Sequence, residues 1–303
     1  MTSPGPCPLS LRDRTSSMRA EEGGTNTPLA RWLGKRGLAG LAAEVVLVGI
    51  ALLLYYLVRG LSHERVAVAF DHANQLIDLE KALGIFWEAD LQDRVLSYQW
   101  LVDALNAMYL YGHLPIVFVV AVWLYFRHRP QYLLMRNAFL ISGAIGLIVY
   151  ALFPVTPPRL MPEEFGFTDT VFRQYGVSRV ANPWFLRNEY AAVPSLHFGW
   201  NLLAAVAVWL ASRGVALRSF AVLMPLATLA AIILTANHYF LDAVAGLLAV
   251  AVGMAVALAV RTLVLRYRSE SPGPAGGAAW HGWLSWLGGV ADRSDGQPVG
   301  VGQ

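Results

Sequence analysis

Charge is scarce in this chain. Asp, Glu, Lys and Arg supply only 14% of the 303 residues, whereas soluble domains average about a quarter. Hydrophobic residues supply 56%, so we expect a chain solvated largely by lipid. The net charge of +3 is small and spread out. Without a basic block of the kind that grips nucleic acid, we expect no nucleic-acid partner.

Cysteine is also nearly absent. The single cysteine, Cys7, excludes an intrachain disulfide, and no cluster of Cys and His predicts zinc. We find no ligand cluster for another metal, so we expect neither a metal nor a cofactor.

Long apolar runs, in contrast, are abundant. A helix needs about 20 residues to span a bilayer, and six segments between two polar tails approach or exceed that length. We expect residues 1–37 to form a disordered cytoplasmic tail and residues 269–303 a flexible C-terminal tail. The sequence predicts an all-α, polytopic membrane domain over residues 38–268. Its six transmembrane helices are expected at 38–59, 100–126, 132–153, 195–212, 218–237 and 240–264.

Residues 62–98 have a different pattern. Apolar residues recur there at helical spacing, and acidic residues are interleaved with them. This pattern predicts one amphipathic helix that lies at the membrane interface and does not span it. The acidic residues are Asp71, Asp78, Glu80, Glu88, Asp90 and Asp93.

Basic residues predict the orientation. With six spans, four flanks rich in Lys and Arg fall on one side, which should be the cytoplasm. We therefore expect a multi-pass plasma membrane protein with both termini in the cytoplasm. The loop 154–194 is then outside, yet it contains four arginines, and an anionic substrate would explain them. These are Arg159, Arg173, Arg179 and Arg187.

Three polar sequences should meet at that outer face. Pro157-Pro158-Arg159 follows the third span, Pro194-Ser195-Leu196-His197 opens the fourth, and the sequence from His238 to Asp242 opens the sixth. Each polar residue alone has a structural explanation, such as helix capping or contact with lipid headgroups. Ionisable residues in membrane segments are costly, however, so their convergence favours a functional site.

The residue types suit phosphoryl transfer. His238 and Asp242 are four residues apart and share a helix face, so the carboxylate can fix the imidazole tautomer and make the other nitrogen a better nucleophile. His197 can act as acid and base. Arg159 can hold phosphate oxygens in a two-pronged grip. Ser195 adds a hydroxyl and backbone N–H groups at a helix start.

Further polar residues lie on the second span. Asn106, Tyr109 and His113 are three and four residues apart. Tyr109 and His113 could line a headgroup pocket, or the group could form a hydrogen-bond network between helices. The sequence leaves both possibilities open.

The two longest motifs resemble a known family. Pro194-Ser195-Leu196-His197 and Asn237-His238-Tyr239-Phe240-Leu241-Asp242 are similar to the second and third signatures of the type-2 phosphatidic acid phosphatase superfamily, over roughly residues 60–265. The resemblance implies that His238 attacks phosphorus and forms a phosphohistidine. It also implies that Asp242 supports His238, that His197 is the acid/base, and that no metal is required.

Three departures resemble one branch of that superfamily. Leu152 and Ile232 replace a lysine and an arginine of the main branch, and Leu196 replaces a glycine. With the sequence of residues 153–159, these changes look like the branch of the inositol phosphorylceramide synthases, which move a phospho-headgroup between lipids. Another residue must then replace the missing cations, and the candidates are Arg187, Arg173 and Arg179.

The resemblance favours a lipid phosphotransferase, with inositol phosphate as one candidate headgroup. The first alternative is a phosphatase that hydrolyses a phosphatidic acid-like or polyprenyl phosphate ester. A transporter or scaffold that binds an anion is the alternative of another class. Transporters tend to show internal repeats and broken spans at the midplane, and the sequence shows neither. The expected partners are a lipid phosphate substrate and membrane lipids.

Overall fold

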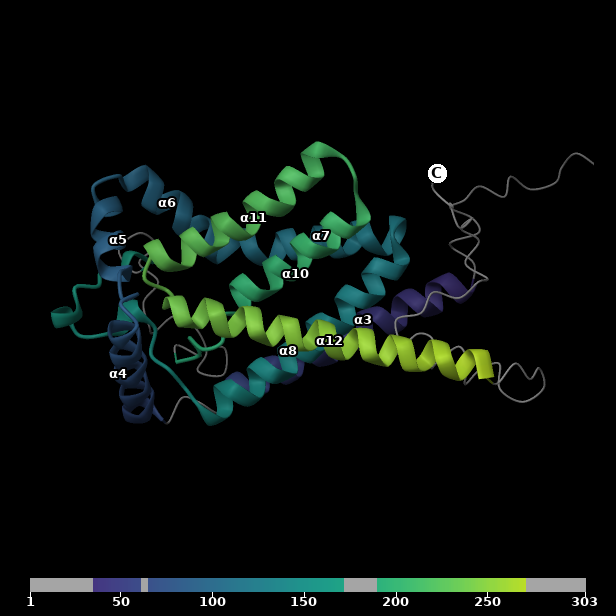
Figure 1. Ribbon diagram of the computed structural model, residues 1–303, viewed down its shortest axis with the longest axis horizontal. Helices are drawn as coiled ribbons and strands as arrows, with labels where there is room; N and C mark the ends of the chain where they lie inside the picture. Colours follow the sequence, from purple (N-terminus) through teal and green to yellow (C-terminus); the bar gives the residue numbers. More distant parts are fainter. Residues whose placement is uncertain (1–34, 61–64, 172–189, 271–303) are drawn as a thin grey trace, which may run out of the picture. The chain divides into compact units, whose positions relative to one another are not determined.

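The computed structural model describes residues 35–60, 65–171 and 190–270. These residues are helical without any strand, apart from one isolated β-bridge between Val155 and Ala191, so the all-α prediction is confirmed. The helices are α3 (Lys35–Gly60), α4 (Val66–Ala82), α5 (Glu88–Leu96), α6 (Gln99–Ala107), the π-helical η1 (Met108–Gly112), α7 (His113–Arg127), α8 (Arg129–Leu152), the 3-10 turns η2 (Pro158–Leu160) and η3 (Glu163–Phe165), α10 (Leu196–Ala211), α11 (Val215–Leu234) and α12 (Phe240–Glu270) (Figure 1).

The chain divides into two compact units between Leu52 and Leu53. Helix α3 crosses this boundary. All the other helices, and every predicted site residue that the structure describes, lie in the second unit.

Four helical segments are long and apolar enough to cross a membrane: 99–127, α8, α11 and 240–267 of α12. Two shorter apolar helices, Leu38–Ala51 within α3 and the 16-residue α10, fall below that length. Each of the six apolar segments predicted from the sequence is therefore helical, and four of them are long enough to span.

Helix α10 is the centre of the second unit. It packs against α7, α8, α11 and α12, and the last three run beside it in Figure 1. Glycine makes its contact with α12 very close. A Cβ on Gly246 would lie 2.3 Å from the carbonyl oxygen of Ser195, and one on Gly199 would lie 2.8 Å from that of Gly246. Small residues of this kind let membrane helices approach at backbone distance.

The prediction of one amphipathic helix over residues 62–98 is wrong. The structure has two helices there, α4 and α5, because α4 ends at a Schellman cap. Gly84 has a φ of 70°, its N–H donates to Lys81, and the N–H of Ile85 donates to Glu80. A glycine in the left-handed conformation at this position commonly ends a helix.

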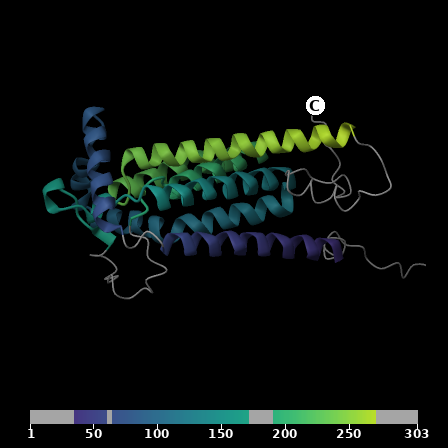
Figure 2. The same cartoon turned by 90° about the horizontal axis from the view of Figure 1, so that it is seen from below.

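The acidic residues of this segment do not all face solvent either. Glu80 and Glu88 are both 0% exposed. Figures 1 and 2 show α4 running crosswise to α12, at the end of the bundle where α12 begins. The two carboxyl groups are thereby brought to the start of α12.

The contact at Gly246 generates a test of this packing. We expect Gly246→Ala to lower stability by about 1–3 kcal/mol, because the new methyl group would overlap backbone that cannot move freely. Thermal unfolding in detergent measures the effect. Gly143→Ala is the matched control, since its Cβ would meet only Trp200, at an ordinary 3.4 Å. Equal shifts in Tm for the two variants would contradict the close packing of α10 on α12.

Candidate functional site

The start of α12 carries the first part of the site. Helix α11 ends at Leu234 and α12 begins at Phe240, so the chain reverses within a few residues. Ala236 makes this possible by adopting a positive φ of 53°. The carbonyl of Ile232 then accepts the N–H groups of both Asn237 and His238, which holds the backbone of His238 against the end of α11.

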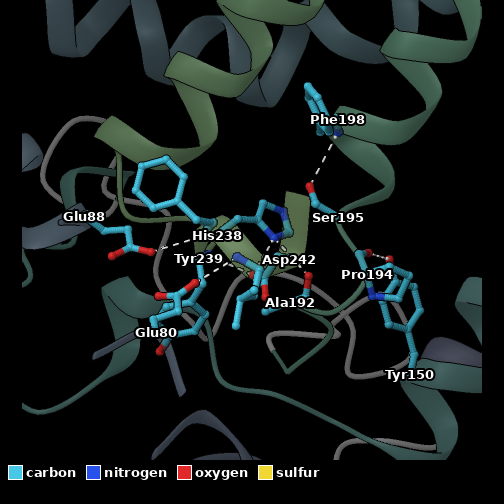
Figure 3. A network of polar contacts seen from close by, with 12 residues as sticks. Glu80, Glu88, Tyr150, Ala192, Pro194, Ser195, Phe198, His238, Tyr239 and Asp242 are labelled. Carbon is cyan, nitrogen blue, oxygen red and sulfur yellow. Dashed lines mark hydrogen bonds and ion pairs between the residues drawn. The ribbon is translucent and has the colours of Figure 1, made fainter. Parts of the chain in front are cut away.

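Hydrogen bonds fix the tautomer of His238 (Figure 3). Its Nδ1 lies 3.1 Å from Asp242 Oδ2 and 3.0 Å from the carbonyl oxygen of Ala192. Both partners are acceptors, so Nδ1 of the neutral ring carries the hydrogen. The lone pair is then on Nε2, which forms no hydrogen bond with any described residue. The predicted pairing of His238 with Asp242 is therefore present, and it leaves Nε2 without a hydrogen bond to the described residues.

The motif that opens α10 is joined to this turn through the backbone. The N–H of Ser195 donates to the carbonyl of Asp242 at 2.9 Å, and the hydroxyl of Tyr150 donates to the carbonyl of Pro194 at 2.8 Å. The Ser195 side chain is fully buried and caps α10 by accepting the N–H of Phe198 at 3.5 Å. Its observed role is thus that of a helix cap.

A row of rings links the second span to the two histidines. Tyr109 stacks on His197 with ring centroids 4.6 Å apart. The ring centroids of His113 and His197 are 4.4 Å apart. The rings of His197 and His238 are 5.7 Å apart. The structure therefore brings together His197, His238, Tyr109 and His113.

Asn201 supports this row and was not predicted. Its amide nitrogen lies 3.0 Å from the carbonyl of His197 and 3.2 Å from His113 Nδ1. Since the amide nitrogen of Asn201 can only donate, His113 Nδ1 is the acceptor. Asn201 lies four residues after His197, and that helical spacing is the signal that could have found it.

Arg159 reaches the same turn from the segment that follows α8. Its N–H donates to the carbonyl of Ala236 at 2.8 Å, two residues before His238, and η2 begins at Pro158. Its guanidinium Nη1 forms an ion pair with Asp169 at 3.1 Å. Hydrogen bonds anchor the segment around Asp169, because Gln92 holds both the N–H and the carbonyl of Thr168. Arg187, Arg173 and Arg179 lie outside the described residues.

Acidic side chains accept hydrogen bonds from the backbone N–H groups at the start of α12. Asp242 Oδ2 also accepts the N–H of Tyr239 at 2.9 Å. Glu88 and Glu80 accept those of Phe240 and Leu241, at 2.9 and 2.8 Å. Burial raises the pKa of the Tyr239 phenol, and the charges of Asp242, Glu80 and Glu88 raise it further. Tyr239 is consequently neutral beside the acids.

An apolar groove of about 370 Å³ is lined by residues of α10, α11, α12 and the segment between α4 and α5. Its lining includes Phe198, next to His197, and Phe240, two residues after His238. The other lining residues are Ile85, Trp87, Leu229, Ala243, Val244 and Leu247. In the part of the chain that the structure describes, no group of three His, Cys, Asp or Glu residues could hold a metal ion.

The family profile of the PAP2 superfamily, the type-2 phosphatidic acid phosphatases, matches residues 74–256. The match extends from α4 into α12 and contains all the residues that build the site. The chain belongs to the PAP2 superfamily. No curated protein and no solved structure gave a significant match to the chain. As a PAP2-superfamily protein with several apolar helices, it is a membrane protein whose relatives act on lipid phosphates.

One departure from the main branch of the PAP2 superfamily has a clear structural setting. Ile232, where the main branch has arginine, is fully buried and packs with Ile233 and Ala243. A guanidinium would have to be accommodated in this apolar cluster, at a high cost of desolvation. The second departure, Leu152, is 70% exposed at the end of α8.

The geometry generates a prediction for Asp242. We expect Asp242→Asn to fold but to lower turnover of a lipid phosphate about 10²- to 10⁴-fold, because the imidazole loses the carboxylate that fixes its tautomer. Turnover by purified protein in detergent and lipid measures the loss. Asp90→Asn, at an exposed position on α5, is the control. A folded Asp242→Asn protein with turnover close to that of the control would contradict this role.

Proposed function

We propose that this protein is a membrane-embedded lipid phosphotransferase that moves a phospho-headgroup through a phosphohistidine at His238. The observation that carries the proposal is the state of the His238 ring. Asp242 and the carbonyl of Ala192 hold Nδ1, and Nε2 has no hydrogen-bond partner among the described residues. A histidine oriented in this way is suited to nucleophilic attack.

The proposed reaction has two displacements. First, the lone pair of His238 Nε2 attacks phosphorus, the bond from phosphorus to the leaving oxygen breaks, and His197 donates a proton to that oxygen. Next, His197 takes the proton from an acceptor hydroxyl, whose oxygen attacks phosphorus and breaks the P–N bond. The ring centroids of the two histidines are 5.7 Å apart, and a positioned acid/base contributes about 10²–10⁴-fold.

The phosphate and the lipid chain need separate sites. Arg159 is the described cation tied to the turn before His238, and its fork-shaped guanidinium matches phosphate oxygens. We assign it, with Arg187 from outside the described residues, to phosphate binding. Tyr109 and His113 contact His197 and would face the headgroup. The apolar groove beside Phe198 and Phe240 would hold part of the lipid chain.

The nature of the acceptor divides transferases from phosphatases. A lipid or polyol hydroxyl in the second displacement gives transfer, whereas water gives hydrolysis of the same phosphoenzyme. The three departures at Leu152, Leu196 and Ile232, which resemble the inositol phosphorylceramide synthases, support transfer. Analysis of the products distinguishes transfer from hydrolysis.

We further propose six transmembrane spans in the plasma membrane, with both termini cytoplasmic and the site at the outer face. The two shorter apolar helices, α10 and the described part of α3, would complete the six. The positive-inside bias of the flanks supports this orientation.

The topology can be tested by cysteine labelling in a Cys7→Ser background. Single cysteines at Glu164 and Arg213, both exposed, should react from opposite sides with a membrane-impermeant reagent. Glu164 should react in intact cells, and Arg213 only after the membrane is opened. Reaction of both from one side would reject the six-span topology.

The phosphoenzyme provides the central test. With a lipid donor labelled at phosphorus, rapid quenching under alkaline conditions should trap label on the protein, and acid should release it. His238→Ala should abolish both the label and turnover, while His128→Ala, at the N-terminal end of α8, should retain them. Near-normal turnover in His238→Ala would refute the mechanism.

The same trapped label identifies the acceptor. Added lipid or polyol alcohols should divert it from free phosphate into a new phosphate monoester, or from the free phospho-headgroup into a new phosphodiester. Hydrolysis products alone, across a broad panel of alcohols, would establish the phosphatase alternative.

A further inference from the structure

Two acidic residues from outside the motifs hold the start of α12. Glu80 is at the end of α4 and Glu88 opens α5, about 150–160 residues before their partners. Each uses Oε1 to accept one backbone N–H, from Leu241 at 2.8 Å and Phe240 at 2.9 Å. Both side chains are completely buried, and Figure 3 shows them converging on the turn that carries His238.

The two carboxyl groups lie close enough to influence each other. As two ionised carboxylates they would repel each other, and each could only accept hydrogen bonds. In each of them the second oxygen, Oε2, has no N–H or O–H partner among the described residues. One proton shared between the pair satisfies both groups and removes the repulsion.

The charges around Glu80 favour its neutral form. The groups that face it are Glu88 on α5, Tyr239 before α12 and Asp242 in the first turn of α12. Burial, the neighbouring Glu88 and the charge of Asp242 raise the pKa of Glu80 to about 9, against the lowering effect of the Leu241 N–H. Glu80 is thus the proton carrier of the pair near neutral pH.

We propose that Glu80 and Glu88 are positioning residues that set the first turn of α12, and with it Asp242 and His238, and that they act as a pair sharing one proton. They do not touch the reacting atoms. They bind the backbone of Phe240 and Leu241, the two residues between Tyr239 and Asp242. A displacement of this turn moves the carboxylate that orients His238, and small errors of position in a reacting group cost about 10²-fold in rate.

The shared proton makes the pair of Glu80 and Glu88 sensitive to alkaline pH. A carboxyl group whose pKa is raised in the folded protein stabilises the fold below its unfolded pKa, and this contribution is lost as the pH rises through the folded value. For Glu80 the loss therefore runs from its ordinary pKa of 4.5 up to about 9, and it is complete above that pH. Above it, two buried carboxylates repel each other at the start of α12.

Substitution at Glu80 tests the pair. Glutamine can accept the N–H of Leu241 and donate its amide to Glu88, so Glu80→Gln copies the protonated acid. We expect Glu80→Ala to lower kcat about 10²-fold with little change in KM, because Arg159 is untouched. Glu80→Gln should restore most of that loss. Asp78→Asn, at an exposed position on α4, is the matched control and should behave as wild type.

Stability provides a readout that needs no substrate. The Tm of wild type and of Asp78→Asn should fall as the pH rises from 4.5 to about 9 and then level off, and this fall should be absent in Glu80→Gln. The inference about kcat rests on the proposed function, whereas the Tm profile does not. A failure of phosphoryl transfer is therefore distinguishable from a failure of the acid pair.

Two results would overturn the proposal. One is a kcat for Glu80→Gln as low as that for Glu80→Ala, and the other is the same loss of Tm with rising pH in Glu80→Gln and wild type. If Glu80→Gln does not fold, infrared spectroscopy of the wild type decides. A protonated-carboxyl band at pH 7 that disappears near pH 9 supports the shared proton, and a spectrum of ionised carboxylates alone at pH 7 overturns it.

Discussion

The carboxylate of Asp242 is the interaction on which the rest of the site depends. One oxygen, Oδ2, accepts both His238 Nδ1–H and the N–H of Tyr239. Through its own carbonyl the same residue accepts the N–H of Ser195. The side chain therefore orients the imidazole and begins α12, while the backbone holds the start of α10, which carries His197. A single residue thus relates the two histidines that the proposed mechanism requires.

The sequence predicts those features of the site that follow from local spacing. His238 and Asp242 pair because residues four apart share a helix face. His197 and Arg159 are predicted to lie near this pair, because the hydrophobic pattern predicts that the ends of their segments share one side of the membrane. Helical segments appear where the apolar runs predicted them, since run length is a strong signal for membrane helices.

What the sequence did not predict depends on contacts between distant segments. The carbonyl of Ala192 binds His238, but a backbone group has no signature in the sequence. Asp169 pairs with Arg159 because Gln92 holds the neighbouring residue Thr168, a contact between segments far apart in the sequence. The interleaved pattern predicts a polar helix face for Glu80, although Glu80 follows the buried Ala73 and Ile77 at helical spacing. Gly84 is a residue type that commonly ends a helix. The contact with Ala192 can be found only in a structure, whereas the sequence pattern contains signals for the burial of Glu80 and for the helix end at Gly84.

The backbone contact at Gly199 and Gly246 has a consequence for how substrate preference can diverge. A Cβ at either glycine would overlap backbone of the other helix, so α10 and α12 are held at a short separation. This contact restrains the spacing of the elements that carry His197 and His238. Differences in substrate preference are then expected in the segments around the two histidines, such as the turn between α4 and α5.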